Sequence, residues 1–182
     1  MNSSISIRLA DPQDAKALLK IYAPYVENTP ITFEYEVPSP AEFEGRIREI
    51  SSRYPYLVAC KGSEILGYSY ACTFKSRAAY DWSVETSIYI DQGARSLGIG
   101  SLLYQKLEEL LKKQNICNLC ACITYPNPES IAFHERHGYS TVAHFHRSGY
   151  KFHTWYDMIW MEKALGEHSD SPKPFIPIKE VL

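Results

Sequence analysis

The chain has 182 residues, a formal net charge of −2 and 22% charged residues. This length suits one buried core, and the slightly acidic balance argues against a binder of nucleic acid or anionic membranes, which usually presents a strong positive field. The N-terminal sequence MNSSISIRLADPQD does not resemble a secretory signal, and no apolar run approaches the ~20 residues that span a bilayer. We therefore expect a cytoplasmic protein whose five cysteines are reduced thiols rather than disulfides or zinc ligands.

Apolar periodicity and turn residues predict the secondary structure. In chain order we expect a strand at 5–9, helices at 11–22 and 41–51, strands at 56–61, 65–74 and 82–90, a helix at 98–113, a strand at 117–124, a helix at 129–137, and strands at 139–146 and 150–162. Asp11-Pro12 is typical of a helix start, and Pro24 is expected to end that helix. Ser148-Gly149 is the expected turn between the last two strands.

This order of elements predicts a mixed α/β sheet with helices on its faces. Three strands run together before the third main helix, so the pattern is not that of a doubly wound fold. No linker or repeat divides the chain, and we expect a single domain over residues 1–165. Residues 166–182 are rich in proline, serine and charge, and we interpret them as a mobile tail.

The most informative local feature is the glycine-containing turn of residues 95–101, Arg-Ser-Leu-Gly-Ile-Gly-Ser, between a strand and a helix. The first N–H groups of a helix have no internal partner, and glycine lets an anion approach the backbone closely. The turn therefore predicts a phosphate or pyrophosphate site. Ser101-Leu102 stands where a P-loop needs Lys-Ser/Thr, and Leu103 stands where a dinucleotide fingerprint needs Gly or Ala. A tight turn without a ligand is the alternative.

At this point the sequence resembles the GNAT superfamily of N-acetyltransferases, in which an Arg/Gln-x-x-Gly-x-Gly/Ala turn binds the pyrophosphate of CoA. Two further blocks, residues 79–85 (AYDWSVE) and 127–139 (NPES followed by HE-x-x-GY), are similar to the phosphinothricin N-acetyltransferase group. The resemblance covers the chain from Ile5 to about Lys163. It implies a GNAT-type fold with a central, mostly antiparallel mixed sheet flanked by helices, acetyl-CoA as co-substrate, and a homodimer.

The resemblance also implies which residues hold acetyl-CoA. The backbone of 88–90 would pair with pantetheine, the turn would hold the pyrophosphate, and residues near 127–133 would follow the arm between them. The full expected set is Ile88, Tyr89, Ile90, Arg95, Ser96, Leu97, Gly98, Ile99, Gly100, Ser101, Asn127, Ser130 and Phe133.

Transfer of an acetyl group to an amine requires removal of a proton, because the protonated amine has no lone pair. Glu85 is the candidate general base, because glutamate is disfavoured within strands and its presence in this one needs a reason. The alternative is that this face of the strand simply meets solvent. His134 is a candidate acid or a partner of Glu85, with a structural histidine as the alternative. The resemblance suggests a backbone N–H near Ile88 as the oxyanion donor. We expect no covalent cysteine intermediate and no catalytic metal.

Two loops are expected to flank the acceptor. The candidate substrate-binding residues are Phe33, Phe74, Lys75, Arg77 and Tyr80. The two cations could meet an acidic group of the substrate, or could be solvated loop charges. The phosphinothricin group often has arginine after the phenylalanine, where this chain has Glu34. His144 and His146 alternate on one strand face, where we expect surface or dimer contacts rather than a metal.

The sequence thus predicts an acetyl-CoA-dependent N-acetyltransferase for a small amino-acid-like amine of the phosphinothricin, methionine sulfoximine or methionine sulfone type. An acetyltransferase for another amine, such as a polyamine, an antibiotic or a protein N-terminus, is the first alternative. A non-catalytic acyl-CoA sensor is the second. Nucleic acid and membranes are not expected partners.

Overall fold

The structure is a computed structural model that describes residues 4–95 and 97–182. Its helices and strands, in chain order, are β1 (Ile5–Leu9), α1 (Ala15–Asn28), α2 (Pro40–Ser51), β2 (Tyr56–Lys61), β3 (Glu64–Thr73), β4 (Ser83–Ile90), α3 (Ile99–Lys113), β5 (Asn118–Tyr125), α4 (Pro128–Arg136), β6 (Ser140–Lys151) and β7 (Thr154–Ala164). Among the described residues, no helix has both the length and the apolar character needed to cross a bilayer.

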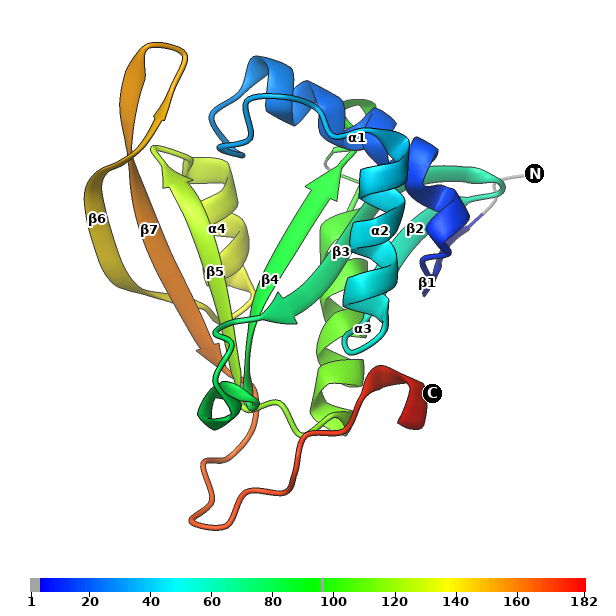
Figure 1. The fold of residues 1–182 in the computed structure, drawn as a ribbon, viewed down its shortest axis with the longest axis vertical. Helices are drawn as coiled ribbons and strands as arrows, with labels where there is room; N and C mark the ends of the chain where they lie inside the picture. Colours follow the sequence, from blue (N-terminus) through cyan, green and yellow to red (C-terminus); the bar gives the residue numbers. More distant parts are fainter. Residues whose placement is uncertain (1–3, 96) are drawn as a thin grey trace.

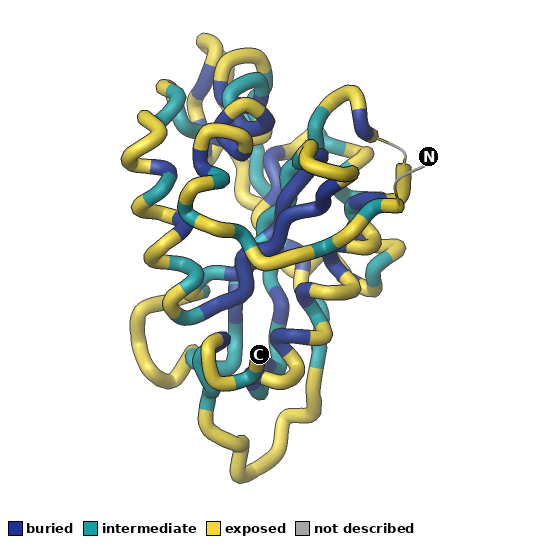
Figure 2. The backbone as a smooth tube through the Cα atoms, turned by 90° about the vertical axis from the view of Figure 1, so that its right-hand side faces the viewer, coloured by how far each residue is buried: buried dark blue, intermediate teal, exposed yellow. Residues whose placement is uncertain are grey.

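The strands form one seven-stranded sheet in the order β1-β2-β3-β4-β5-β7-β6 (Figure 1). Every neighbouring pair is antiparallel except β4 and β5, which are parallel. The predicted mixed, mostly antiparallel sheet flanked by helices is therefore confirmed. Buried residues gather along the central strands, and exposed segments surround them (Figure 2).

Two hydrophobic clusters hold the helices against the sheet. The α3 cluster includes Leu103, Leu107 and Leu111, all at most 1% exposed, which lie on one face of the helix because they are spaced by four residues. The cluster under α1 and α2 is rich in tyrosine, and the rings of Tyr56 and Tyr70 stack with centroids 4.8 Å apart. The helices α1 and α2 contact β2, β3 and β4, whereas the loop between them contacts β5 and β6.

The parallel pair β4 and β5 is the feature that positions the site. Their pairing extends only from Ser83–Glu85 to Asn118–Cys120. Beyond Glu85 the two strands diverge toward their C-terminal ends (Figure 1). A fork opens there, and the inner edge of β4 from 86 to 90 does not pair with β5.

Two boundaries differ from the sequence prediction. The first helix continues through Pro24 to Asn28, because Tyr25 and Val26 pack into the α1–α2 cluster. This packing compensates for the one intrahelical hydrogen bond that a proline removes.

The last hairpin turns at Phe152 and His153, which have φ of 50° and 59°, rather than at Ser148-Gly149. Gly149 instead lies inside β6 beside a register shift, where an added β-carbon would clash with the ring of Phe33. The glycine therefore serves a close packing contact and not the chain reversal.

The segment after residue 165, expected to be a mobile tail, packs against the body of the protein. Gln114 donates hydrogen bonds from Nε2 to the carbonyls of Arg53 and Ile176, each at 2.8 Å. Ile178 is 2% exposed and belongs to the α3 cluster. A few apolar residues of this polar segment therefore pack against the α3 cluster.

A buried lysine anchors the loop between α1 and α2. Lys151 is 2% exposed, and its ammonium donates to the carbonyls of Val26, Thr29 and Thr32 at 2.6, 3.0 and 2.8 Å. The first two of these carbonyls belong to the end of α1, where the backbone acceptors have no intrahelical donor. The strand β6 thereby holds this loop beside the open end of the fork.

We predict that Lys151→Met lowers the free energy of unfolding by about 2–5 kcal/mol, because methionine fills the space but leaves three carbonyls without a donor. Urea denaturation of the variant and the parent protein measures the difference. Lys61→Met, at the exposed end of β2, is the matched control and should change stability by less than about 0.5 kcal/mol. Equal stability of the two variants would contradict the anchoring role.

Candidate active site

A groove of about 810 Å³ lies at the open end of the β4–β5 fork. The edge of β4, the start of α3 and the start of α4 form its walls. Of the predicted coenzyme contacts, it brings together Ile88, Ile90, Arg95, Gly98, Ile99, Gly100, Ser101, Asn127, Ser130 and Phe133. A smaller cavity of about 70 Å³ continues into the fork and is lined by Tyr89, Ser130 and His134, among others.

The glycine turn has the geometry that anion binding requires. Gly98 precedes α3 with φ of 75°, a left-handed conformation that suits glycine, and no side chain caps the helix start among the described residues. Gly100 lies against Phe133, because an added β-carbon would be 2.9 Å from Cε2 of that ring. Arg95 lines the same groove and donates to the Tyr25 hydroxyl at 3.3 Å. Free amides, a helix N-terminus and a guanidinium thus meet at one place.

One described residue of the predicted contacts stands apart from this set. Leu97 is 57% exposed and does not line the groove. Ser96 lies outside the described residues.

Groove residues that the sequence analysis missed come from distant segments. Tyr25 lines the groove from α1 and donates a hydrogen bond of 2.6 Å to the carbonyl of Ile90 on the open edge of β4. Ile31, from the loop after α1, lines both cavities. The general excess of tyrosine was the only sequence signal for Tyr25, and Ile31 had none, because nothing local links 25 or 31 to the glycine turn.

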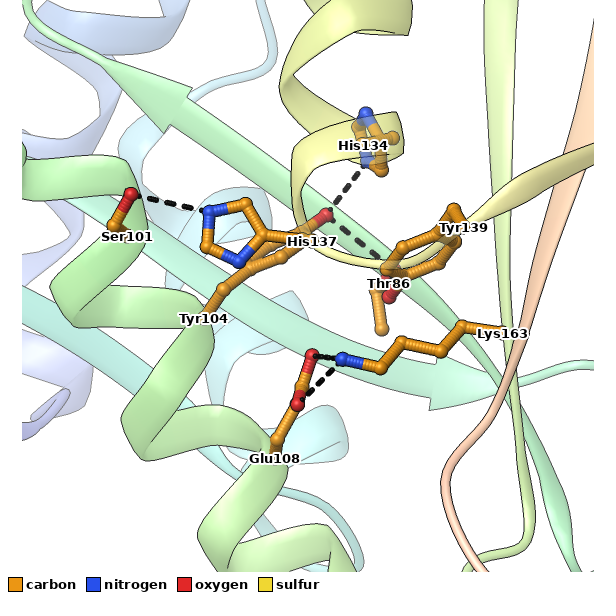
Figure 3. A network of polar contacts seen from close by, with 8 residues as sticks. All are labelled: Thr86, Ser101, Tyr104, Glu108, His134, His137, Tyr139 and Lys163. Carbon is orange, nitrogen blue, oxygen red and sulfur yellow. Dashed lines mark hydrogen bonds and ion pairs between the residues drawn. The ribbon is translucent and has the colours of Figure 1, made fainter.

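A buried polar network fills the base of the fork (Figure 3). The Thr86 hydroxyl donates to the carbonyl of Cys120 across the fork at 3.2 Å. The Tyr139 hydroxyl lies 3.2 Å from the Thr86 hydroxyl oxygen. The Tyr104 hydroxyl lies 2.9 Å from Nε2 of His134. These side chains come from β4, α3, α4 and the start of β6, so the network joins the elements that hold the two strands apart.

The hydrogen bonds fix the tautomer of His134. Its Nδ1 lies 2.8 Å from the carbonyl oxygen of Ser130, which can only accept, so Nδ1 carries the proton. In the neutral ring Nε2 then accepts the one proton of the Tyr104 hydroxyl at 2.9 Å, in preference to the Thr86 hydroxyl oxygen, which lies 3.4 Å from that hydroxyl. Burial lowers the pKa of His134 below its ordinary value of 6.5. At neutral pH the side chain is consequently a neutral acceptor in this network, with no free N–H to offer.

Glu85 lies at the last position of β4 that pairs with β5, between Cys72 of β3 and Cys120 of β5. Its side chain points to the sheet face opposite Thr86, because successive residues of a strand alternate. Burial raises the pKa of the Glu85 carboxyl above its ordinary value, and the Lys75 ammonium opposes that effect. Within the described residues no hydrogen bond or ion pair engages this carboxylate, so it is available to a substrate. Glu85 and His134 approach the fork from opposite faces of β4.

Aromatic side chains and one cation surround the face that carries Glu85. The rings of Phe74 and Trp160 are 5.5 Å apart, and Phe74 also contacts Tyr80 at 5.9 Å. The Lys75 ammonium lies 5.0 Å from the Phe74 ring and 5.8 Å from that of Trp160. Sequence reasoning missed Trp160, because only the pairing of β5 with β7 places it beside this cluster.

The other two predicted substrate residues lie elsewhere. Phe33 packs against Gly149 and lies 6.5 Å from the Tyr156 ring, on the loop that Lys151 anchors. Arg77 is exposed at the start of a short 3-10 turn. The structure therefore brings together three of the five predicted substrate residues, Phe74, Lys75 and Tyr80.

Comparison with known proteins gives a consistent result. Residues 7–160 match the family model described as an acetyltransferase (GNAT) domain. The chain is 32% identical over 177 residues to a phosphinothricin N-acetyltransferase of Streptomyces viridochromogenes, covering 97% of this chain and 96% of that protein. It is 31% identical to an L-methionine sulfoximine/L-methionine sulfone acetyltransferase of Pseudomonas paraeruginosa, covering 93% and 99%.

Among solved structures, the fold is similar to that of a GNAT superfamily phosphinothricin acetyltransferase from Sinorhizobium meliloti in complex with AcCoA. The TM-score is 0.87 at 31% identity, with 98% of this chain and 99% of that chain covered.

We predict that His134 remains neutral and protonated at Nδ1 at pH 6.5, where an unperturbed histidine is half protonated. The unfolded chain binds a proton at this position more readily than the folded one, so His134 lowers stability as the pH falls below 6.5. Long-range ¹⁵N–¹H NMR of the imidazole nitrogens distinguishes the tautomers from the cation. An imidazolium signal from His134 at pH 6.5 would exclude the assigned network.

Proposed function

This enzyme belongs to the GNAT acetyltransferase family, and on that premise we propose that it transfers the acetyl group of acetyl-CoA to the primary amine of a small amino-acid-like substrate. The phosphinothricin, methionine sulfoximine and methionine sulfone type is the acceptor class we favour, because relatives of at least 31% identity carry those names. One observation carries the proposal. A single fork has an uncapped helix N-terminus at its open end and an unpaired, half-buried carboxylate at its closed end.

In this proposal the pyrophosphate of CoA lies on the free amides at the start of α3, with Arg95 beside it. The pantetheine arm follows the inner edge of β4, whose backbone groups from 86 to 90 have no β5 partner. Asn127, Ser130 and Phe133 form the opposite wall. The thioester would then reach the end of the fork, near Glu85. The groove volume of about 810 Å³ is within the range of cofactor sites.

The acceptor would lie on the sheet face that carries Glu85. Phe74, Tyr80 and Trp160 provide apolar walls, and Lys75 provides a cation for an acidic group of the substrate. Glu34, where the phosphinothricin group often has arginine, is paired with Arg46 at 2.6 Å. This ion pair carries no net charge, so the loop does not supply the cation that an arginine at 34 would, and the proposed acceptor site relies on Lys75.

The chemistry requires one proton acceptor and one oxyanion donor. Glu85 takes a proton from the ammonium of the acceptor, and the free amine attacks the thioester carbonyl. A backbone N–H of β4 near Ile88 stabilises the oxyanion, and the CoA thiolate leaves as the carbonyl is restored. The second surplus proton of the amine nitrogen passes through water to that thiolate, which gives CoASH and the neutral amide. A thiolate with a pKa of about 8.5 departs without obligatory protonation. Of the roles considered for His134, we favour that of a positioning residue that holds Tyr104 and the fork.

We also propose that the protein forms a homodimer through the β6–β7 hairpin. The exposed apolar side chains of this hairpin are Val142, Phe145, Tyr150, Phe152 and Trp155, each at least 42% exposed. Such a concentration on one hairpin is typical of an interface.

A thiol-release assay with acetyl-CoA and a panel of amines tests the function. We expect turnover with methionine sulfoximine, methionine sulfone or phosphinothricin and little with spermidine or a peptide N-terminus, because Lys75 repels polycations and the aromatic walls suit a small acceptor. Preference for a polyamine or a peptide would support the alternative acetyltransferase. Binding of acetyl-CoA without turnover on any amine would support the acyl-CoA sensor.

We predict that Glu85→Gln lowers kcat by at least about 100-fold while the affinity for acetyl-CoA stays within about twofold, because glutamine keeps the shape but cannot accept the proton. Steady-state kinetics and calorimetric titration with acetyl-CoA separate the two effects. Glu162→Gln is the matched control, since Glu162 pairs with Cys120 on the adjacent strand but is exposed. If both variants retain full turnover, Glu85 is not the base.

A further inference from the structure

Three potential metal ligands converge on the last hairpin, away from Glu85. Nε2 of His144 lies 2.8 Å from Oδ2 of Asp157, and Nδ1 of His146 lies 3.0 Å from the same oxygen. All three ligand atoms lie within 4.8 Å of one another, and this is the one such group of histidine, cysteine or acidic residues among residues 4–95 and 97–182. The sequence showed the two histidines, for which surface or dimer contacts were expected, but not the carboxylate that β7 contributes and that makes a ligand set of them.

The backbone fixes this arrangement. Arg147, with φ of 49°, donates its N–H to Oδ1 of Asp157 at 2.9 Å, which leaves Oδ2 directed at the imidazoles. The β6 strand has a register shift between Phe145 and Gly149, and this irregularity places His146 beside His144 with ring centroids 4.5 Å apart. The Arg147 N–H and the two imidazoles hold the pKa of Asp157 well below its ordinary value, so the carboxylate is charged at neutral pH.

We propose that His144, His146 and Asp157 bind a divalent first-row transition ion, with Zn²⁺ as the expected occupant. The three atoms surround one point, where an ion would replace the protons that the imidazoles now share with the carboxylate. Ligand bonds of about 2.0–2.1 Å in a tetrahedron require ligand atoms about 3.3 Å apart. The two nitrogen-to-oxygen separations of 2.8 and 3.0 Å therefore need to increase by a few tenths of an ångström, and the nitrogen-to-nitrogen separation, which is at most 4.8 Å, needs to approach the same value.

The ligand chemistry selects this class of ion. Two imidazole nitrogens and one carboxylate oxygen suit zinc, copper, nickel or iron, whereas calcium and magnesium prefer sets made of oxygen alone. Two neutral imidazoles and one carboxylate carry a net charge of −1, which attracts a dication. The hydrogen bond from Arg147 to Oδ1 acts as an outer contact that orients the ligand oxygen.

The position of the site also permits an ion to enter. The side chain of His146 is 77% exposed and that of His144 is 36% exposed. An ion bound there would join the irregular part of β6 to β7 and stabilise the hairpin against local opening. Metal binding at this site is independent of the acetyl transfer proposed for the fork.

The test uses the full-length, untagged chain after treatment with a chelator. Calorimetric titration with ZnCl₂ should show one ion per chain, and ZnCl₂ should raise Tm. His146→Gln and Asp157→Asn should each weaken the affinity by at least about tenfold. His153→Gln is the matched control, because His153 is exposed on the same hairpin but belongs to its turn, and this variant should bind as the parent does.

Co²⁺ absorption identifies the ligands. A nitrogen and oxygen set gives only the visible ligand-field bands, whereas a bound cysteine adds a thiolate charge-transfer band in the near ultraviolet. Absence of binding, equal binding by His146→Gln and the parent, or a thiolate band would each overturn the proposal. Thermal unfolding also separates loss of the site from loss of folding in the variants. A folded variant without the site keeps its unfolding transition, and its Tm does not rise with ZnCl₂.

Discussion

The site depends on the parting of two parallel strands. β4 and β5 pair over only three positions and then diverge, which leaves the edge of β4 from 86 to 90 without a β5 partner. Unpaired backbone groups of this kind are costly unless water or a ligand satisfies them. The fork therefore lacks strand-to-strand hydrogen bonds that an extended ligand can supply. Glu85 stands at the last paired position, where the open edge begins.

Buried polar side chains maintain this opening. Thr86 bonds across the fork to the carbonyl of Cys120, and Tyr104 with His134 fills the space behind it. A fully satisfied network of this type specifies one arrangement, because any shift would leave a buried group without a partner. On the other side, Tyr25 donates to the carbonyl of Ile90 and limits where a ligand can pair with β4.

Several sequence predictions held because they rest on local chemistry. The glycine turn predicted a helix N-terminus after a strand, and Gly98 adopts the left-handed conformation immediately before α3. The alternation of 82–90 correctly placed Glu85 and Thr86 on opposite faces. Two predictions failed where packing outweighed a local preference. Pro24 does not end α1, and Gly149 does not form the turn of the last hairpin but packs beneath Phe33.

The sequence by itself determined the order of elements, the family resemblance, the phosphate-type turn and Glu85 as the candidate base, because each is encoded by residues adjacent in the chain. Only the tertiary structure decided which distant side chains join them. Trp160, Ile31 and Tyr25 reach the site, Lys151 anchors the loop, and Asp157 meets the two histidines only through strand pairing and helix packing. The physical reason is that these contacts depend on sheet order and register, and no local pattern specifies either.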